Sequence, residues 1–336
     1  MAIQYRVLQP PDIQVSRPHQ EFASDVLLGL SRSPKSVPCK YLYDAEGARL
    51  FREIMELPEY YLTRCELEIL QDHKYEIACL VGGRPFNLVD LGAGDGRKTE
   101  TLLEHFLKRE LDFQYVPIDI SEPAVHGLVK RLSIGYSHLR TEGLVVDYLD
   151  GLKWLSDLNE HHNVVLFLGS NIGNFSHSEA KAFLNCLWNA LNDGDYILIG
   201  FDLKKDINKL LAAYNDSRGV TAEFNLNLLR RINRELGGSF DPDRFKFHSM
   251  YNPLSGAIES YLVSCERQVV DIEELKQSFR FEAGELLHTE NSYKFLDSDI
   301  LQLAEETGFN IADQLHDSSH CFMDSLWQVM KGPGDS

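Results

Sequence analysis

A short apolar run that ends in three closely spaced glycines constrains the fold of this chain more than any other feature. Residues 87–91 read Asn-Leu-Val-Asp-Leu, and glycines follow at positions 92, 94 and 96. A helical pattern then begins, with apolar residues at 102, 103, 106 and 107. Glycine lets the backbone approach a ligand and adopt turn geometries that are closed to other residues. A buried strand, a glycine turn and a helix in this order predict an α/β sheet that seats a nucleotide-like ligand.

The spacing of the glycines indicates which kind of ligand. It reads G-x-G-x-G rather than the dinucleotide pattern G-x-G-x-x-G, and Asp90 lies inside the strand. This variant favours S-adenosylmethionine (SAM), which has no pyrophosphate to place on the helix N-terminus. The alternative interpretation is an ordinary strand-to-helix turn without a ligand.

Strand and helix patterns alternate from the glycine turn to about residue 202. Strand-like runs lie at 88–91, 115–120, 144–146, 164–168 and 196–201, with helical periodicity between them. Such alternation predicts a parallel, doubly wound sheet that binds ligands at the carboxyl ends of its strands. A short helix at 298–307 and two runs at 310–315 and 321–330 then predict an antiparallel hairpin that closes the sheet.

The remaining segments predict a second, α+β domain for the substrate, or a lid. Helical patterns lie at 19–30, 210–214 and 221–236, and another helix ends near Pro58. Antiparallel strands are expected at 245–251, 258–270 and 279–283. We therefore expect residues 65–204 and 294–332 to form the SAM-binding domain and residues 18–64 and 205–293 the substrate domain. Residues 1–17, which include Pro10 and Pro11, are expected to form a surface arm.

Composition narrows the class of partner. The 336 residues carry a formal net charge of −18, which argues against nucleic acid or an anionic membrane, because phosphate binding needs a basic face. Six cysteines without a C-x-x-C pair indicate reduced thiols and no structural metal. No apolar leader or membrane-length stretch occurs, so we expect a cytoplasmic protein with a small-molecule substrate.

Acidic residues stand where two further strands are expected to end. Asp119 lies near the end of the second strand, where a carboxylate can accept both ribose hydroxyls of an adenosine cofactor. A helix-capping role for Asp119 is the alternative, which Ser121 weakens because serine is itself a good cap. Asp147 and Tyr148 follow the third strand and can hold adenine by its amino group and its face. A solvated loop acid explains Asp147 equally well.

The fourth strand ends in the run FLGSNIGNF at 167–175. Asparagine offers a carbonyl acceptor together with amide donors. Asn174 is therefore suited to hold a substrate amine by its hydrogens and to leave the nitrogen lone pair free. A plain Asn/Gly turn is the alternative.

Five runs together resemble one family. They are YLYDAEGARLF…LPEYYLTR at 41–64, DLGAGDGRKT at 90–99, FLGSNIGNF at 167–175, AAYNDSRGVTAEFNLNLLRRINREL at 212–236 and HTENSYKF at 288–295. The sequence resembles the histidine-specific, SAM-dependent Nα-methyltransferases, which form hercynine on the ergothioneine pathway, over roughly residues 20–332. The resemblance implies a class I methyltransferase fold, Rossmann-like, and a monomer without a metal.

The resemblance also implies roles for individual residues. Cofactor contacts are expected at the glycine turn and the strand ends: Gly92, Gly94, Lys98, Asp119, Asp147 and Tyr148. Substrate contacts are expected at Tyr60, Asn174, Tyr214, Glu290 and Ser292, with Tyr43 and Phe51 lining the same pocket. In this arrangement the tyrosines at 60 and 214 hold the substrate carboxylate, Asn174 holds the α-amine, and Tyr43 is the candidate for removing amine protons.

Glu290 and Ser292 are the residues expected to recognise the imidazole. They are two apart in a strand-like run, so their side chains share a face. An imidazole needs one acceptor and one group that can donate or accept, which a carboxylate and a hydroxyl supply. A solvated strand face is the alternative.

Two departures from the family keep other functions open. The glycine turn reads GAGDGRK where a GSGTSEK type is expected, and Ser260 stands where the family often has methionine near the imidazole. An Nα-methyltransferase of tryptophan or a derivative is therefore the first alternative. A protein methyltransferase or a SAM-binding regulatory module is the second.

Overall fold

The computed structural model describes residues 5–7, 18–156 and 162–332, which divide into two compact units. The large-sheet unit comprises Met1–Leu8, Leu62–Lys204 and Lys294–Ser336. The small-sheet unit comprises Gln9–Tyr61 and Lys205–Tyr293. Each unit is therefore assembled from separate segments of the chain.

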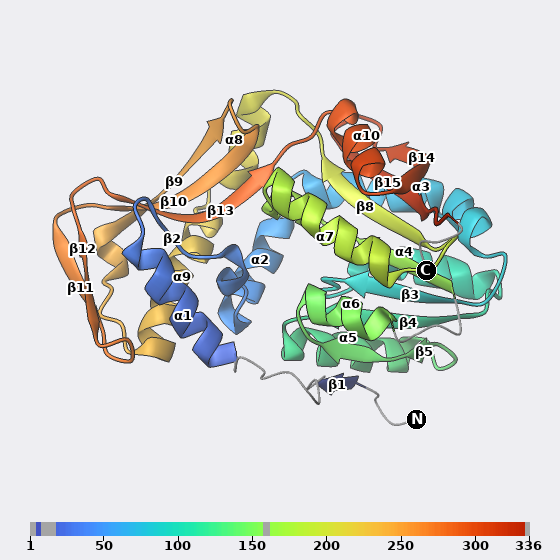
Figure 1. Cartoon of the computed structure of the whole chain (residues 1–336), viewed down its shortest axis with the longest axis horizontal. Coiled ribbons are helices and arrows are strands. Elements are labelled where there is room, and N and C mark those ends of the chain that lie inside the picture. The colour runs from blue at the N-terminus through green and yellow to red at the C-terminus, as the bar shows by residue number, and fades with distance from the viewer. Residues whose placement is uncertain (1–4, 8–17, 157–161, 333–336) are drawn as a thin grey trace. The chain divides into compact units, whose positions relative to one another are not determined.

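The large-sheet unit is built on one mixed sheet (Figure 1). Its strand order is β1-β6-β4-β3-β7-β8-β15-β14, and β5 also pairs with β4. The strands are β1 (Tyr5–Val7), β3 (Phe86–Leu91), β4 (Phe113–Asp119), β5 (Arg140–Thr141), β6 (Gly143–Val145), β7 (His162–Phe167), β8 (Tyr196–Asp202), β14 (Phe309–His316) and β15 (Phe322–Val329). All pair in parallel except β15, which runs antiparallel to both β8 and β14. The predicted doubly wound sheet with a closing hairpin is confirmed.

Helices connect the strands and cover both faces of this sheet. They are α3 (Leu62–Val81), α4 (Arg97–Lys108), α5 (Glu122–Gly135), α6 (Tyr148–Ser156), α7 (His177–Ala190) and α10 (Asp297–Glu306). Helices α6 and α7 pack together on one face, and α3 and α4 pack together on the other (Figure 1). The start of α7 is fixed by a capping box between Ser176 and Glu179.

Strand β3 is the centre of the sheet, and all six of its residues are buried. Burial of Asp90 within it is tolerated because Thr99 donates to its carboxylate over 2.6 Å and Tyr115 over 2.8 Å. The polar residue inside the glycine-turn strand therefore joins β3 to α4 and β4.

One N-terminal segment differs from expectation. Tyr5–Val7, which we expected in a surface arm, forms β1 and pairs in parallel with β6. Three residues are too few for an alternating pattern to predict a strand. The strand is instead stabilised by backbone pairing with β6, which is distant in sequence. Residues 1–4 and 8–17 lie outside the described residues.

The small-sheet unit combines four strands, a hairpin and several helices. The sheet has the order β2-β13-β10-β9, and β11 pairs with β12. The strands are β2 (Lys35–Ser36), β9 (Phe245–Asn252), β10 (Ala257–Ser264), β11 (Gln268–Ile272), β12 (Gln277–Phe281) and β13 (Leu286–Tyr293). The helices are α1 (Pro18–Ser31), α2 (Ala45–Met55), α8 (Ile207–Tyr214) and α9 (Val220–Leu236), with 3-10 turns η1 (Cys39–Leu42) and η3 (Pro242–Arg244).

The single strand expected over 258–270 is wrong. The chain leaves the sheet after Ser264, whose backbone carbonyl accepts from Gly284 and whose N–H donates to Glu285, and β11 begins at Gln268 in a separate hairpin. These partners lie about twenty residues away, so the local alternation of apolar residues does not reveal the break.

Helices α8 and α9 cover one face of the four-stranded sheet. Strand β13 carries a bulge there: Glu290 pairs with Ser260 and His288 with Tyr261, which leaves Thr289 as the extra residue. Thr289 donates to Asn225 of α9 over 2.6 Å. No helix of the described residues is long and apolar enough to cross a membrane.

Candidate functional site

The glycine turn after β3 depends on its missing side chains. Gly92 has φ +77°, and a Cβ there would lie 2.8 Å from the Tyr148 hydroxyl oxygen and 2.9 Å from Asn171 Nδ2. Gly96 has φ +67°, and a Cβ there would collide with Leu128 at 2.5 Å. Gly94, at φ +55°, has no atom within 4 Å of a built Cβ. The turn is therefore closely packed on two sides and open at Gly94, where a ligand can approach the backbone.

Asp119 ends β4 and ties the turn to the next strand. Its Oδ2 accepts from the Gly94 N–H over 3.0 Å and its Oδ1 from the Ser121 N–H over 2.8 Å. Burial raises the pKa of Asp119 above its ordinary value, although the hydrogen bonds from Gly94 and Ser121 act to lower it. Each carboxylate oxygen keeps acceptor capacity for one further donor.

Ser121 does not cap α5 with its side chain, contrary to our expectation. It occupies the N-cap position, but its hydroxyl makes no capping hydrogen bond, and its N–H donates to Asp119. Asp147 is exposed and accepts the N–H of Asp150 over 2.9 Å at the start of α6. Tyr148 packs its ring against Phe167 at 5.3 Å while its hydroxyl reaches the glycine turn. The structure thus gives Asp147 a local role and aims Tyr148 at the predicted cofactor position.

Lys98 stands in the first turn of α4. Its ammonium forms an ion pair with Glu66 of α3, and it lies 3.2 Å from where a Cβ of Gly169 would stand. Glu66 also accepts the Gly169 N–H over 2.6 Å. Lys98 is therefore held at the carboxyl edge of β7.

The segment after β7 is a strained turn. Ser170 has φ +57°, and its hydroxyl accepts the N–H of Asp202 over 3.2 Å. The 3-10 turn η2 (Asn171–Asn174) follows. Asn174 is partly exposed, and its side chain makes no hydrogen bond with the residues that the structure describes. The side chain of Asn171 lies next to Gly92, and we did not predict this from the sequence. Its position in the Gly/Asn-rich run at 167–175 could have indicated it.

In the small-sheet unit, two predicted substrate residues bond directly. The hydroxyls of Tyr214, at the end of α8, and Ser292, on β13, lie 2.6 Å apart, and both side chains are buried. Glu290 lies two residues before Ser292 on the same face of β13, opposite the buried Ser260 of β10. The predicted imidazole-recognition pair therefore lies on the face that α8 and α9 cover.

A row of aromatic rings joins the other predicted substrate residues. Tyr43 lies 5.4 Å from Phe51, Phe51 lies 6.1 Å from Tyr60, and Tyr60 lies 6.3 Å from Tyr214 between ring centroids. Phe224 of α9 contacts Tyr43 at 5.3 Å and Phe51 at 5.9 Å, each between ring centroids. Sequence reasoning missed Phe224, because it stands in an ordinary apolar stripe of a helix.

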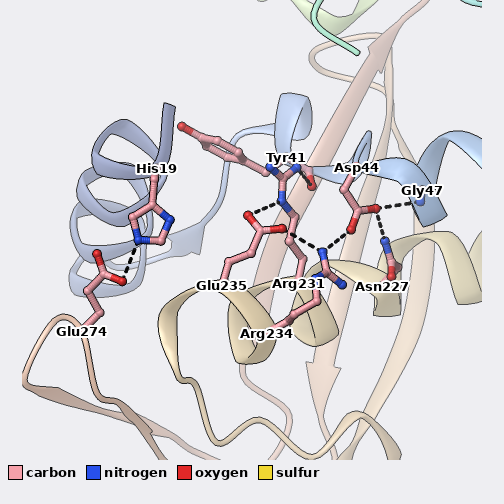
Figure 2. Close-up of polar contacts among 9 residues, drawn as sticks. All are labelled: His19, Tyr41, Asp44, Gly47, Asn227, Arg231, Arg234, Glu235 and Glu274. Carbon is pink, nitrogen blue, oxygen red and sulfur yellow. Dashed lines mark hydrogen bonds and ion pairs between the residues drawn. The ribbon is translucent and has the colours of Figure 1, made fainter. Parts of the chain in front are cut away.

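An ionic network supports the start of this aromatic row (Figure 2). Asp44, next to Tyr43, caps α2 by accepting the Gly47 N–H over 2.7 Å, and it also accepts from Asn227 over 2.7 Å and Arg234 over 2.5 Å, both on α9. Burial favours the neutral acid, but the hydrogen bonds from Gly47, Arg234 and Asn227 outweigh it, so the pKa of Asp44 lies below its ordinary value.

Further contacts in Figure 2 secure the neighbouring segments. Arg231 of α9 donates to the Tyr41 carbonyl over 3.0 Å, and His19 of α1 contacts Glu274 at 2.8 Å. Helix α9 is thus the common support for η1, α2 and Tyr43.

Each unit therefore gathers its own set of predicted residues. The large-sheet unit holds the glycine turn, Lys98, Asp119, Tyr148 and Asn174 at the carboxyl ends of its parallel strands. The small-sheet unit brings Tyr43, Phe51, Tyr60, Tyr214 and Ser292 into one contiguous set, with Glu290 beside it. No cluster of three or more potential metal ligands occurs within 5–7, 18–156 and 162–332.

Comparison with known proteins adds a family and its members. Residues 22–329 match the family model described as histidine-specific methyltransferase, SAM-dependent. The histidine N-alpha-methyltransferase of Mycolicibacterium smegmatis is 36% identical over 284 residues, which is 84% of this chain and 87% of that protein. The Mycobacterium tuberculosis protein of the same name is 37% identical over 277 residues, 82% of this chain and 85% of that protein. Ergothioneine biosynthesis protein 1 of Schizosaccharomyces pombe is 31% identical over 286 residues, 83% of this chain but 37% of its own length.

Proposed function

Since the chain belongs to the family of SAM-dependent, histidine-specific methyltransferases, we propose that it methylates the α-amine of free L-histidine. The reaction is a trimethylation that yields hercynine, a step of ergothioneine biosynthesis. The observation that carries this proposal is the match to the family model over residues 22–329, together with 36–37% identity to two histidine N-alpha-methyltransferases.

The large-sheet unit supplies groups that fit SAM. Gly94 leaves its backbone open, Asp119 keeps acceptor capacity for ribose hydroxyls, and the Lys98 ammonium suits the cofactor's carboxylate. We propose Gly92, Gly94, Lys98, Asp119, Asp147 and Tyr148 as the cofactor-binding residues. The Asp147 carboxylate accepts the Asp150 N–H at Oδ1, and its Oδ2 has the acceptor chemistry that suits the adenine amino group.

The small-sheet unit supplies groups that fit histidine. We propose that Tyr60 and Tyr214 hold the carboxylate and that Glu290 and Ser292 bind the two imidazole nitrogens. The hydrogen bond between Tyr214 and Ser292 fixes the position of the Ser292 hydroxyl, which therefore needs little reorganisation on binding. Phe51 and Tyr43 add apolar surface beside this set.

Bound SAM supplies an electrophilic methyl group on a sulfonium centre. The amine must be deprotonated before each transfer, because an ammonium has no lone pair. In our proposal Asn174 accepts a hydrogen bond from the amine and orients its lone pair, and Tyr43 helps to remove the protons. Most of the acceleration then comes from orientation and exclusion of water, to which the aromatic row contributes.

Mass spectrometry of a reaction with SAM and free histidine tests the function. Mono-, di- and trimethylated histidine should appear in succession, and a parallel reaction with tryptophan should give far less product. Absence of methylated histidine, or faster methylation of tryptophan, would overturn the proposal.

The variant Glu290→Ala tests the assigned recognition of the imidazole. It should raise KM for histidine at least tenfold and leave the Kd for SAM within twofold, because the proposed charge-assisted hydrogen bond to the imidazole is lost. An equal effect on both would make Glu290 a structural residue.

We further propose that the protein is a monomer and needs no metal. Ultracentrifugation would test the first point, and retained activity in a chelator would test the second.

A further inference from the structure

The large-sheet unit buries two carboxyl groups close to Lys98, and they differ sharply in their partners. Glu66 of α3 is 1% exposed, accepts the Gly169 N–H over 2.6 Å and forms the ion pair with Lys98. Asp324 of β15 is 0% exposed, and neither of its oxygens has a hydrogen-bond partner among the described residues. We call Glu66 and Asp324 the buried carboxyl pair.

A glycine brings the two groups to the same face of the sheet. Asp324 pairs with Gly200 in the β8–β15 register, so their Cα–Cβ directions point to one face. A Cβ on Gly200 would lie 2.3 Å from Glu66 Oε1. The Glu66 carboxylate therefore occupies the space that a side chain at position 200 would fill, beside Asp324.

Two buried carboxylates and a single ammonium cannot all be charged without a large cost. A carboxylate without donors in a dry interior is strongly disfavoured against its protonated form, and a neighbouring anion disfavours it further. Glu66 accepts an N–H and pairs directly with Lys98, whereas Asp324 has no hydrogen-bond donor among the residues that the structure describes. Burial raises the pKa of Asp324 well above its ordinary value, the charge of Glu66 raises it further, and Lys98 offsets part of this.

We propose that Asp324 is protonated at neutral pH, and that its neutrality lets Glu66 remain charged and position the Lys98 ammonium for the cofactor's carboxylate. Glu66 and Asp324 are thus positioning residues that act through Lys98. The inference rests on the proposed function, since it takes Lys98 as a cofactor contact. Asp90 of β3 also interacts electrostatically with Lys98, and its carboxylate accepts from Thr99 and Tyr115 instead.

Infrared difference spectroscopy of the cofactor-free protein tests the protonation state directly. The spectrum of the wild type minus that of Asp324→Asn at pH 7 should show the C=O stretching band of a protonated carboxyl. Asp195→Asn is the matched control: Asp195 is also 0% exposed, but it accepts from Asn163 and Asn192, and this variant should keep the Asp324 band and the Kd for SAM. Loss of ionised-carboxylate bands in Asp324→Asn instead would overturn the proposal.

Calorimetric titration with SAM tests the positioning role. Glu66→Gln should raise the Kd for SAM at least fivefold, because Lys98 loses the anion that holds it at the edge of β7. Unchanged or tighter binding by Glu66→Gln would refute the role of Glu66. The infrared measurement uses neither SAM nor histidine, so it judges the carboxyl pair even if the protein methylates another amine.

Discussion

Replacement of Asp44 by alanine should destabilise the small-sheet unit by about 3 kcal/mol. Loss of the N-cap on α2 costs about 1 kcal/mol. The Asn227 amide is buried and would lose an acceptor, which costs about 1–2 kcal/mol. Arg234 is 53% exposed, so its ion pair with Asp44 adds only about 0.5 kcal/mol after solvent screening.

Thermal unfolding followed by circular dichroism measures this loss. A change of about 3 kcal/mol corresponds to a fall in Tm of about 6–12 °C. Asp44→Asn is the matched control: its carbonyl oxygen can still cap α2 and accept from Gly47 and Asn227, whereas its amide nitrogen cannot accept from Arg234. Because the ion pair with the half-exposed Arg234 contributes little, Tm should fall by less than half as much. A fall of under 2 °C for Asp44→Ala would refute the reasoning that this network holds α2 on α9.

The same network predicts how the Tm difference between the wild type and Asp44→Ala depends on pH. Since the folded-state pKa of Asp44 lies below its unfolded value, its contribution is fully present above the unfolded pKa of about 4 and is lost as the pH falls through the lower folded value. The Tm difference between wild type and Asp44→Ala should therefore stay constant from pH 5 upward and shrink below about pH 4. A difference that grows in acid would contradict this sign.

Three further predictions concern ligand binding and turnover. Gly92→Ala should raise the Kd for SAM at least tenfold by calorimetry, because its Cβ meets a tyrosine hydroxyl at 2.8 Å. Gly284→Ala is the control: it carries similar backbone strain at φ +80° without a contact within 4 Å and lies outside the proposed cofactor residues, so the Kd for SAM should stay unchanged. Tyr214→Phe removes both the hydrogen bond to Ser292 and the proposed contact to the substrate carboxylate, and should raise KM for histidine at least fivefold at an unchanged Kd for SAM. An unchanged KM would exclude both proposed roles of the Tyr214 hydroxyl. Asn174→Ala should lower kcat about 100-fold in steady-state assays, with the Kd for SAM unchanged, because misalignment of the amine costs about this much.

The large sheet could be predicted from sequence because its signals are local. Apolar runs of strand length, glycines at 92, 94 and 96 and helical periodicity between them each report on a few adjacent residues. Parallel strands buried on both faces give continuous apolar runs, as at residues 164–167 of β7, and these runs are a clear signal.

The features that sequence reasoning missed depend on residues far apart in the chain. The bulge at Thr289 is defined by its pairing with β10 and by Asn225, 64 residues away. Glu66 stands in an ordinary helical pattern, and only the fold places it over Gly200 and beside Gly169. The sequence showed which side chains could bind a ligand, but it did not show which distant residues orient those side chains.

The small-sheet unit is made from two segments of the chain that are synthesised at different times, and this affects when the unit can fold. Asp44 must wait for Asn227 and Arg234, which follow it by 183 and 190 residues. At about 5–20 residues per second, α2 is exposed for roughly 10–40 s before α9 emerges. The intervening residues 62–204 contain the parallel strands of the other unit, so the N-terminal helices reach their final packing late. We therefore expect nascent chains stopped before residue 220 to be sensitive to proteolysis within residues 18–61 and resistant there once β13 is complete.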